Sequence, residues 1–523
     1  MKEILRKLKD YYSLSDSEFE ERIAVPSVSD LPNPFILYSD FHLLIDKLKE
    51  YIKENKKIVV YGDYDVDGLT STSILVGTLQ IMGVTPGYYI PSRYIDGYGI
   101  NKTRVDQFIA KGYEVIITVD NGISEVETID YAKSKGLEVI VIDHHEVTKD
   151  VLPNADFIFH QYICNISNYN ISAAFLALMV SYGILGEYNE YFITLAGLAV
   201  FSDSMPVIHA NLTLARLSLY YVNKYKYLQF TSLLNVVPTE ITEEDYNYQV
   251  IPALNSVGRV DKTIWINNIV KYFLSSDKAY IQNTALKILS FNLERKEIIK
   301  KFDIASIKFT GNIAFDYVSL PLGVVGLLAN KTMSSYNKPA VLFTEDPSDN
   351  TLLVGSIRTP QGYKTSDVLS KECKFLVRYG GHDEAAGFTI DKKDIDLLKK
   401  TLDEMLVKVD EDETDEKYIL LSAKEAQQDY DEIKKFGPYG NSFPSPLIGV
   451  EIEDDKLAFS RSGEHMLSNF DGLKVTYFNH TKDEFKSESY IFIGKLGTSV
   501  FKGITSIELK VSDFIDKNKI SLD

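Results

Sequence analysis

Acidic and imidazole side chains follow three apolar runs in the first third of the chain. The runs 58–61, 115–119 and 139–142 are almost continuously β-branched, which is typical of buried parallel strands. In such a sheet, ligands bind outside the carboxyl ends of the strands. We therefore expect a single cluster of the side chains that follow these runs: Asp63, Asp65, Asp67, Asp120, Asp143, His144 and His145.

A cluster of this composition predicts a divalent-metal site. Neighbouring carboxylates repel one another and raise each other's pKa, and bound cations remove that conflict. Oxygen ligands mixed with imidazole are typical of a manganese or magnesium site rather than of a thiolate-type zinc site. A pair of such ions activates water and holds the attacking and leaving oxygens of a phosphodiester. The pattern therefore indicates phosphoester hydrolysis.

Two other interpretations of these residues are a calcium loop and simple turns. DYDVDG also opens EF-hand loops, but the twelfth residue counted from Asp63 is Ile74, where such a loop needs glutamate. The preceding segment also has the pattern of a strand rather than a helix. Asp-Gly and Asn-Gly mark turns, yet three strand ends with seven candidate ligands favour the metal site.

The same segments resemble the DHH phosphoesterases. GDYDVDG (62–68), VDNG (119–122) and IDHH (142–145) are similar to the first three motifs of that family, and Asp203 in LAGLAVFSDSMP is similar to the fourth. Later segments resemble those of RecJ-type nucleases: IPALNSVGRV (251–260), the DHH-associated segments 322–343, GSIR (355–358) and GGHDEAAGFT (380–389), and FGPYGNSFPSP (436–446), which is similar to the start of an oligonucleotide-binding domain.

Length and pattern predict several domains. A chain of 523 residues is too long for one core. We expect an α/β fold: a doubly wound DHH domain with a mainly parallel sheet, a long connecting helix, a smaller α/β DHH-associated domain and a C-terminal OB-like β-barrel. The expected boundaries are a helical lead-in at 1–46, the DHH domain at 47–220, a helical connector at 221–308, the DHH-associated domain at 309–409, an acidic linker at 410–435 and the OB-like domain at 436–523.

The long connecting helix is expected within 275–302. Its apolar face is predicted from Ile281, Leu286, Leu289 and Leu293. The basic residues Arg295, Lys296, Lys300 and Lys301 are predicted to form an ordinary solvated helix face, and we do not assign them to the substrate cleft.

The cluster and the resemblance together predict a role for each polar side chain. Two Mn²⁺ or Mg²⁺ ions are expected to bind Asp63, Asp65, Asp67, Asp120, His144 and Asp203. Asp120 is expected to bridge the ions, while Asp63 and Asp143 are either ligands or orient the imidazoles. The resemblance implies that His145 faces the scissile phosphate. Arg259 is expected to stabilise the charge that develops there, the alternative being a helix-capping or surface role.

The resemblance also implies a substrate pocket. RecJ-type enzymes hold the 5′-terminal phosphate through an arginine and a Ser-x-Arg pair, here Arg93, Ser356 and Arg358. Asn255, in the Asn-x-x-Gly-Arg segment, is expected to bind substrate as well. Paired glycines let backbone amides approach an anion closely, so a substrate-holding loop is predicted at Gly380, Gly381 and His382.

Composition agrees with a globular enzyme. The net charge of −18 is unusual for a nucleic-acid binder, but bound cations would offset the clustered acids, and EDETDE (411–416) is expected to be a solvated linker. Cys164 and Cys373 are predicted to be buried reduced thiols. No apolar run is long enough to cross a bilayer. We expect a cytoplasmic protein that acts as a monomer.

These observations predict a 5′→3′ exonuclease that degrades single-stranded DNA to 5′-mononucleotides in DNA repair or recombination. A single-strand-binding protein or a helicase is the expected partner. The alternatives are a phosphoesterase acting on short oligoribonucleotides or small nucleotides, and an inactive DHH replication scaffold. The chain departs from the family pattern in SDSMPVIHANLTLAR (202–216) and at Ser256 and Val257, which bears on substrate range and partners more than on chemistry.

Overall fold

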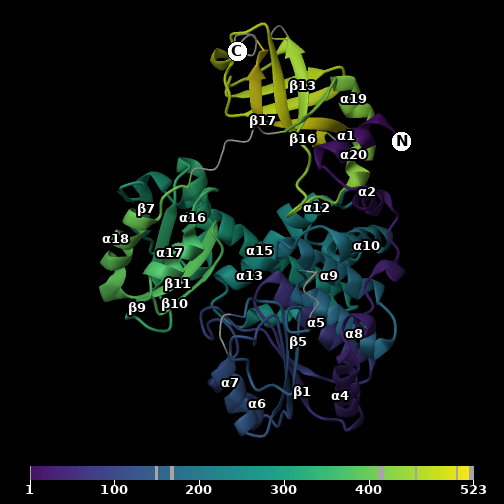
Figure 1. Cartoon of the computed structure of the whole chain (residues 1–523), viewed down its shortest axis with the longest axis vertical. Coiled ribbons are helices and arrows are strands. Elements are labelled where there is room, and N and C mark those ends of the chain that lie inside the picture. The colour runs from purple at the N-terminus through teal and green to yellow at the C-terminus, as the bar shows by residue number, and fades with distance from the viewer. Residues whose placement is uncertain are drawn as a thin grey trace. The chain divides into compact units, whose positions relative to one another are not determined.

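The computed structural model describes residues 2–147, 151–164, 170–409, 417–453, 456–501 and 504–517. They form two compact units (Figure 1). The larger unit consists of Val28–Met205 and Thr213–Asp412, and the smaller unit consists of Met1–Ser27, Pro206–Leu212 and Glu413–Asp523. Part of the predicted acidic linker, 410–416, lies outside the described residues.

The first sheet of the larger unit is parallel throughout, as predicted. Its order is β2–β1–β3–β4–β5. The order reverses between β1 and β3, and an open parallel sheet binds ligands beyond its strands at such a point. The strands are β1 (Ile58–Tyr61), β2 (Gly87–Tyr89), β3 (Val115–Val119), β4 (Glu138–Asp143) and β5 (Phe157–His160).

Helices cover both faces of this sheet (Figure 1). On one face lie α6 (Lys102–Ala110) and α7 (Val126–Ser134), which share a core with alternate residues of β1, β3 and β4. On the other face lie α4 (Phe41–Lys53), α5 (Val66–Ile81) and α8 (Ala173–Leu185). Helix α5 is buried from Val66 to Leu79, because it lies between the sheet and further helices. Two short elements precede α4: η1 (Val28–Asp30) and α3 (Pro34–Leu37).

A series of helices connects this domain to a second sheet. They are α9 (Glu190–Ser202), α10 (His209–Tyr225), α11 (Leu228–Thr231), α12 (Glu243–Asp245), the π-helical turn η2 (Tyr246–Val250), α13 (Ile251–Val260), η3 (Trp265–Asn267), α14 (Asn268–Leu274), α15 (Lys278–Lys301) and η4 (Ile304–Ser306).

The long helix α15 is present where it was predicted, but its predicted apolar face was wrong in part. Leu286 and Leu293 are exposed, whereas the helix buries Ile281, Ile288 and Phe291. The buried face is set by packing against α13, α14 and α11. Leucine spacing alone does not reveal which side those neighbours occupy.

The second sheet of the larger unit has the order β10–β11–β9–β8–β7–β6, in which only β7 and β8 pair in parallel. Its core also contains Cys373; Cys164 is buried in the first domain, and both cysteines are free, as predicted. The elements are β6 (Phe309–Thr310), β7 (Ile313–Tyr317), α16 (Leu322–Tyr336), β8 (Ala340–Glu345), β9 (Leu352–Arg358), α17 (Thr365–Glu372), β10 (Arg378–Gly381), β11 (Ala385–Asp391), η5 (Lys392–Asp394) and α18 (Ile395–Met405).

The smaller unit joins the two ends of the chain. Helices α1 (Glu3–Tyr11) and α2 (Asp16–Ile23) contribute Ile4, Leu8 and Phe19 to one core with the C-terminal strands. The sheet order is β12–β13–β16–β17–β15–β14, and its closure into an OB-like barrel stays a prediction. The elements are β12 (Ile419–Leu421), α19 (Ala423–Gln428), α20 (Tyr430–Phe436), β13 (Ile448–Glu453), β14 (His465–Phe470), β15 (Leu473–Phe478), η7 (Lys482–Glu484), β16 (Ser489–Phe501) and β17 (Ile504–Asp516).

Candidate metal centre

The loop between β1 and α5 places three carboxylates at the carboxyl edge of the parallel sheet. Asp63 lies two residues after β1, and Asp65 caps α5 by accepting a hydrogen bond from the Gly68 amide at 3.1 Å. Asp67 lies in the first turn of the helix. A Cβ at position 68 would lie 2.6 Å from the backbone of Asp63. Glycine therefore lets the loop pack tightly against the helix and keeps the three acids together.

Asp120 follows β3 in an uncommon backbone conformation. Its φ of +61° lies in the left-handed region, where non-glycine residues are rare and often functional. The side-chain amide of Asn121 donates hydrogen bonds to the carbonyls of Val119 at 2.8 Å and Gly62 at 3.0 Å. These bonds join the ends of β1 and β3 and so fix the position from which the Asp120 carboxylate projects.

Asp143, at the end of β4, organises the two histidines that follow it. Its Oδ1 accepts hydrogen bonds from the amides of His144 at 2.8 Å and His145 at 3.2 Å, and it lies 2.8 Å from Nδ1 of His145. Its Oδ2 accepts a bond from the Ile123 amide at 2.9 Å. Asp143 also lies outside the groups of candidate ligand atoms found among the described residues, which supports an orienting role rather than a ligand role.

Two helix ends complete the cluster. The oxygens of Asp67 accept hydrogen bonds from the amides of Ala173 and Ala174 at 2.8 and 2.7 Å, in the first turn of α8. The positive end of the helix dipole stabilises a carboxylate in this position. Asp203 directly follows the last residue of α9, and its carboxylate belongs to the same cluster.

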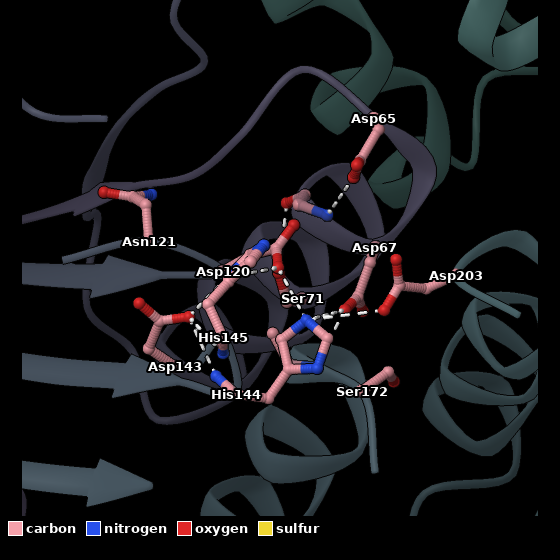
Figure 2. Close-up of polar contacts among 12 residues, drawn as sticks. Asp65, Asp67, Ser71, Asp120, Asn121, Asp143, His144, His145, Ser172 and Asp203 are labelled. Carbon is pink, nitrogen blue, oxygen red and sulfur yellow. Dashed lines mark hydrogen bonds and ion pairs between the residues drawn. The ribbon is translucent and has the colours of Figure 1, made fainter. Parts of the chain in front are cut away.

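These side chains converge on one point (Figure 2). Nε2 of His144 lies 3.2 Å from Asp120 Oδ1, 3.4 Å from Asp203 Oδ2 and 3.5 Å from Asp67 Oδ2. Three groups have ligand atoms within 4.8 Å of one another: Asp120 with His144 and His145, Asp67 with His144 and Asp203, and Asp63 with Asp65 and Asp120. His144 and Asp120 are each shared by two groups, so the groups form one continuous centre.

The electrostatics of this centre are those of acids held together against their repulsion. Burial, followed by the charges of neighbouring aspartates, raises the pKa of Asp63 to about 8, that of Asp67 to about 7 and that of Asp203 to about 8. The same causes raise the pKa of Asp120 well above its ordinary value. Full ionisation of the cluster therefore requires a compensating positive charge.

The two histidines differ in environment. Burial and the charge of His145 lower the pKa of His144 to about 3, and its side chain is only 7% exposed. Burial also acts to lower the pKa of His145, but the bond to Asp143 overrides it and raises the pKa to about 9. The side chain of His145 is 42% exposed and its Nε2 lies 3.2 Å from the Tyr98 hydroxyl. His144 thus faces the acids as a neutral imidazole that can act as a metal ligand. His145 is on the solvent-exposed side of the cluster.

The donor set fits divalent cations. Among the described residues, Nε2 of His144 and Oδ1 of Asp63 are buried without a hydrogen-bond partner, although carboxylate oxygens surround the histidine. A neutral imidazole nitrogen and carboxylate oxygens are ligands of Mn²⁺ and Mg²⁺. The assignment of Asp63, Asp65, Asp67, Asp120, His144 and Asp203 as the ligands remains a prediction.

Arg259 lies at the end of α13, next to the start of α16. Its Nη1 donates to the Gly323 carbonyl at 3.3 Å, and the Tyr94 hydroxyl both donates to the Arg259 carbonyl and accepts a bond from the Gly323 amide. Burial, then the charges of Arg93 and Arg295, lowers the pKa of the Arg259 guanidinium to about 10. This burial does not agree with a surface role for Arg259, which the sequence left as an alternative.

The other predicted substrate residues lie on different elements near Arg259. Arg93 stacks on Tyr64, with 4.3 Å between the guanidinium carbon and the ring centre, and Arg358 Nη1 donates to Ser356 Oγ at 2.6 Å on β9. Asn255 accepts a hydrogen bond from the Val66 amide at 3.1 Å. That bond holds the backbone between Asp65 and Asp67, a positioning contact that the motif alone did not indicate.

Gly380 and Gly381 are exposed at the end of the edge strand β10, where they pair with Gly387 and Ala386 of β11, and His382 begins the turn between the two strands. The amide of His382 donates to the Ala385 carbonyl at 2.9 Å, and Gly381 has a φ of +127°. In the described part of the chain, no hydrogen bond or ion pair links this turn to the acidic cluster. Its role in holding substrate stays a prediction.

Several supporting residues escaped the sequence analysis. His160 Nε2 lies 2.8 Å from the His145 carbonyl, and Gln161 donates to the His144 carbonyl at 3.2 Å. Both follow the apolar run of β5, so the rule that identified the acids would have found them. Ser172 caps α8, and a serine before a long apolar helix was the available signal.

Comparison with known proteins agrees with this fold. Residues 57–199 match the DHH family, N-terminal domain, and residues 311–408 match the DHHA1 domain. The chain therefore contains a DHH N-terminal domain followed by a DHHA1 domain.

The chain is similar to RecJ exonucleases. It is 29% identical over 426 residues to the single-stranded-DNA-specific exonuclease RecJ of Bacillus subtilis, a match that covers 78% of this chain and 53% of that protein. It is 25% identical over 485 residues to the Haemophilus influenzae RecJ, covering 84% and 82%. The crystal structure of Thermus thermophilus RecJ in complex with Mn²⁺ has the same fold, with a TM-score of 0.79 at 20% identity over 98% of this chain and 77% of that one.

Proposed function

We propose that this protein is a metal-dependent 5′→3′ exonuclease that degrades single-stranded DNA to 5′-mononucleotides. The observation that carries the proposal is the convergence of Asp67, Asp120 and Asp203, from three different segments, around Nε2 of His144. The RecJ relatives are named as single-stranded-DNA-specific exonucleases, and a solved RecJ binds Mn²⁺.

The ligands would be Asp63, Asp65, Asp67, Asp120, His144 and Asp203, which hold two Mn²⁺ or Mg²⁺ ions. When bound, the ions supply charge neutralisation and activation of water for attack on phosphorus. Asp143 holds the His145 ring through Nδ1, so Nε2 is turned toward the open side, where the scissile phosphate would bind. Arg259 would contact that phosphate as well and stabilise negative charge as it develops.

The direction of cleavage would follow from a terminal phosphate pocket. Arg93, Ser356 and Arg358 offer donors that would hold a 5′-phosphate, and Ser356 and Arg358 are already hydrogen-bonded to each other. A strand anchored by its 5′ end presents its first internucleotide bond to the centre. Release of the mononucleotide lets the next phosphate enter, so digestion proceeds toward the 3′ end.

The experiment that tests the proposal compares four substrates with Mn²⁺: single-stranded DNA, duplex DNA, RNA and a small nucleotide diester. Label at the 3′ end shows direction, and the size of the released product shows step length. Mononucleotides released from the 5′ end of single-stranded DNA support the proposal. Preferential hydrolysis of the small diester would instead support a small-nucleotide phosphoesterase, and no hydrolysis by a folded, metal-loaded protein would support a scaffold.

The setting of this activity would be DNA repair or recombination in the cytoplasm, with a monomeric enzyme assisted by a single-strand-binding protein or a helicase. Within the described part of the chain, no helix is long and apolar enough to span a membrane.

A further inference from the structure

Four arginines lie close together beside the acidic cluster. The charges of Arg93, Arg295 and Arg358 all act on Arg259, together with that of Asp65. None of the four arginines forms an ion pair with a carboxylate among the residues that the structure describes. By contrast, Arg104 pairs with Asp96 in the same unit. Guanidinium groups without an ion-paired carboxylate are suited to bind an anion, just as the gathered acids are suited to bind cations.

Arg295 is the unexpected member of this group, because its helix was predicted to present a solvated basic face. The residue is half-buried in α15, and burial lowers the pKa of its guanidinium. Its Nη2 donates to Asn292 Oδ1 at 2.9 Å, one helical turn away, and its buried Nε has no hydrogen-bond partner among the described residues. One intrahelical contact uses little of the five-donor capacity of an arginine.

A structural arginine in this protein is bonded differently. Arg22 in the smaller unit is 3% exposed, donates to the carbonyls of Val207 and Pro438, and stacks on Phe443 at 3.4 Å. Arg295 has no comparable set of acceptors among the described residues. Arg93 shares this feature, since its buried Nε likewise has no partner in the described structure. The Nε atoms of Arg93 and Arg295 are therefore available to donate hydrogen bonds to a ligand.

The backbone of α16 leaves the donors of Arg358 and Ser356 uncrowded. Helix α16 begins beside Arg259, and a Cβ at Gly326 in its second turn would lie 3.2 Å from both Arg358 Nη2 and Ser356 Oγ. A side chain at that position would crowd these donors, whereas glycine leaves them accessible. The helix amino terminus and the arginines thus present positive charge to the same region.

We propose that Arg295 is a further phosphate-binding residue, which holds a backbone phosphate of the single strand next to the one that Arg259 contacts. This inference rests on the proposed function. Arginine is suited to this task because its planar fork binds two phosphate oxygens at once. The positive group then spans three elements, with Arg259 on α13, Arg295 on α15 and Arg358 on β9.

The test measures binding of a 5′-phosphorylated, 3′-fluorescein-labelled oligonucleotide by anisotropy, in Mn²⁺ and over a range of salt concentrations. Asp120→Asn serves as the parent protein because it is expected not to cut the strand. Arg295→Gln, Arg295→Lys and the control Lys300→Gln are each made in that parent. Lys300 is exposed on the same helix. Lys300→Gln removes one positive charge, as Arg295→Gln does. Glutamine retains the ability to donate to Asn292.

Arg295→Gln should weaken binding about tenfold or more at low salt and reduce the slope of log K against log salt by about 0.7. Arg295→Lys should keep most of the slope, and Lys300→Gln should match the parent. A parent-like affinity and slope for Arg295→Gln would overturn the inference, as would equal losses in the glutamine and lysine variants accompanied by a lower Tm. If the parent itself does not bind the strand, the proposed function fails instead.

Discussion

At the scale of single residues, the centre depends on side chains that two ligand groups share. Asp120 belongs to two of the three groups of ligand atoms and has a left-handed backbone. His144 is likewise shared, and its nitrogen faces three carboxylates. Replacing a shared residue should disturb both ion positions, whereas replacing Asp203 should disturb one.

Asp120→Asn should therefore abolish nearly all hydrolysis with little effect on folding. Asparagine tolerates the left-handed conformation, so the change removes charge and a ligand rather than the backbone geometry. Loss of an outer partner of a metal ligand costs roughly 10- to 100-fold, and we expect a ligand to cost at least about 100-fold. Turnover with Mn²⁺ and the circular dichroism spectrum are the measurements, with exposed Asp396→Asn as control. A folded variant with near-normal turnover would refute the two-metal centre.

The terminal phosphate pocket can be tested at Arg358. Arg358→Ala removes a charge-assisted contact of roughly 1.5 to 3 kcal/mol, so the preference for a 5′-phosphate over a 5′-hydroxyl end should fall roughly ten- to a hundredfold. The ratio of kcat/KM for the two oligonucleotides is the quantity to measure. Exposed Lys400→Ala in the same domain should leave the ratio unchanged. An unaltered ratio in Arg358→Ala would remove this residue from the pocket.

At the scale of elements, the strands that carry the acids could be predicted from the sequence. β-branched runs indicated β1, β3 and β4 because both faces of a parallel sheet are buried. Contacts between distant segments left no such signal. The amides of α8 that bind Asp67, the bond from Val66 to Asn255 and the buried face of α15 all depend on how elements pack.

The packing of these elements around unpaired acids predicts a dependence of stability on pH. Asp67 and Asp203 have pKa values of about 7 and 8 in the folded protein, against roughly 3.9 when unfolded. Because the folded-state values are raised, this contribution to stability is fully present below about pH 4 and is lost as the pH rises through 7 to 8. In chelator, Tm should therefore fall between pH 5 and pH 8.

Saturating Mn²⁺ should reverse that trend, because cations bind the ionised carboxylates and stabilise the folded state. Calorimetry at a series of pH values, with chelator and with Mn²⁺, measures both curves. The Asp120→Asn variant should show a smaller fall in chelator, since one repelling charge is gone. A Tm in chelator that is constant or rises over this range would contradict the electrostatic account of the cluster.

At the scale of the whole molecule, the smaller unit combines both ends of the chain. The expected helical lead-in does not stand alone, because Ile4, Leu8 and Phe19 share a core with the C-terminal strands. Removing only the C-terminal part would uncover these apolar side chains. Among the residues of this unit that could contact DNA, Phe478 is exposed, whereas Tyr477 is largely buried and stacks on His480.

A protein shortened to residues 28–409 should keep the metal centre and still cut very short oligonucleotides. On long single strands it should bind more weakly and with a smaller salt slope, because fewer phosphates are neutralised. A protein of residues 1–409 is the matched comparison and should aggregate more readily. Affinity and salt slope are measured after folding is verified. Unchanged values for 28–409 on long strands would mean that the smaller unit does not bind DNA.

The shared core also sets an order of events during synthesis. About 400 residues separate Phe19 from Phe436, whose ring it contacts in the core. At roughly 5 to 20 residues per second, the ribosome needs on the order of 20 to 80 s to make the partner strands. The first two helices therefore leave the exit tunnel with their apolar faces uncovered and wait while the catalytic domains fold. During that interval Ile4, Leu8 and Phe19 lack the strands that bury them in the folded protein.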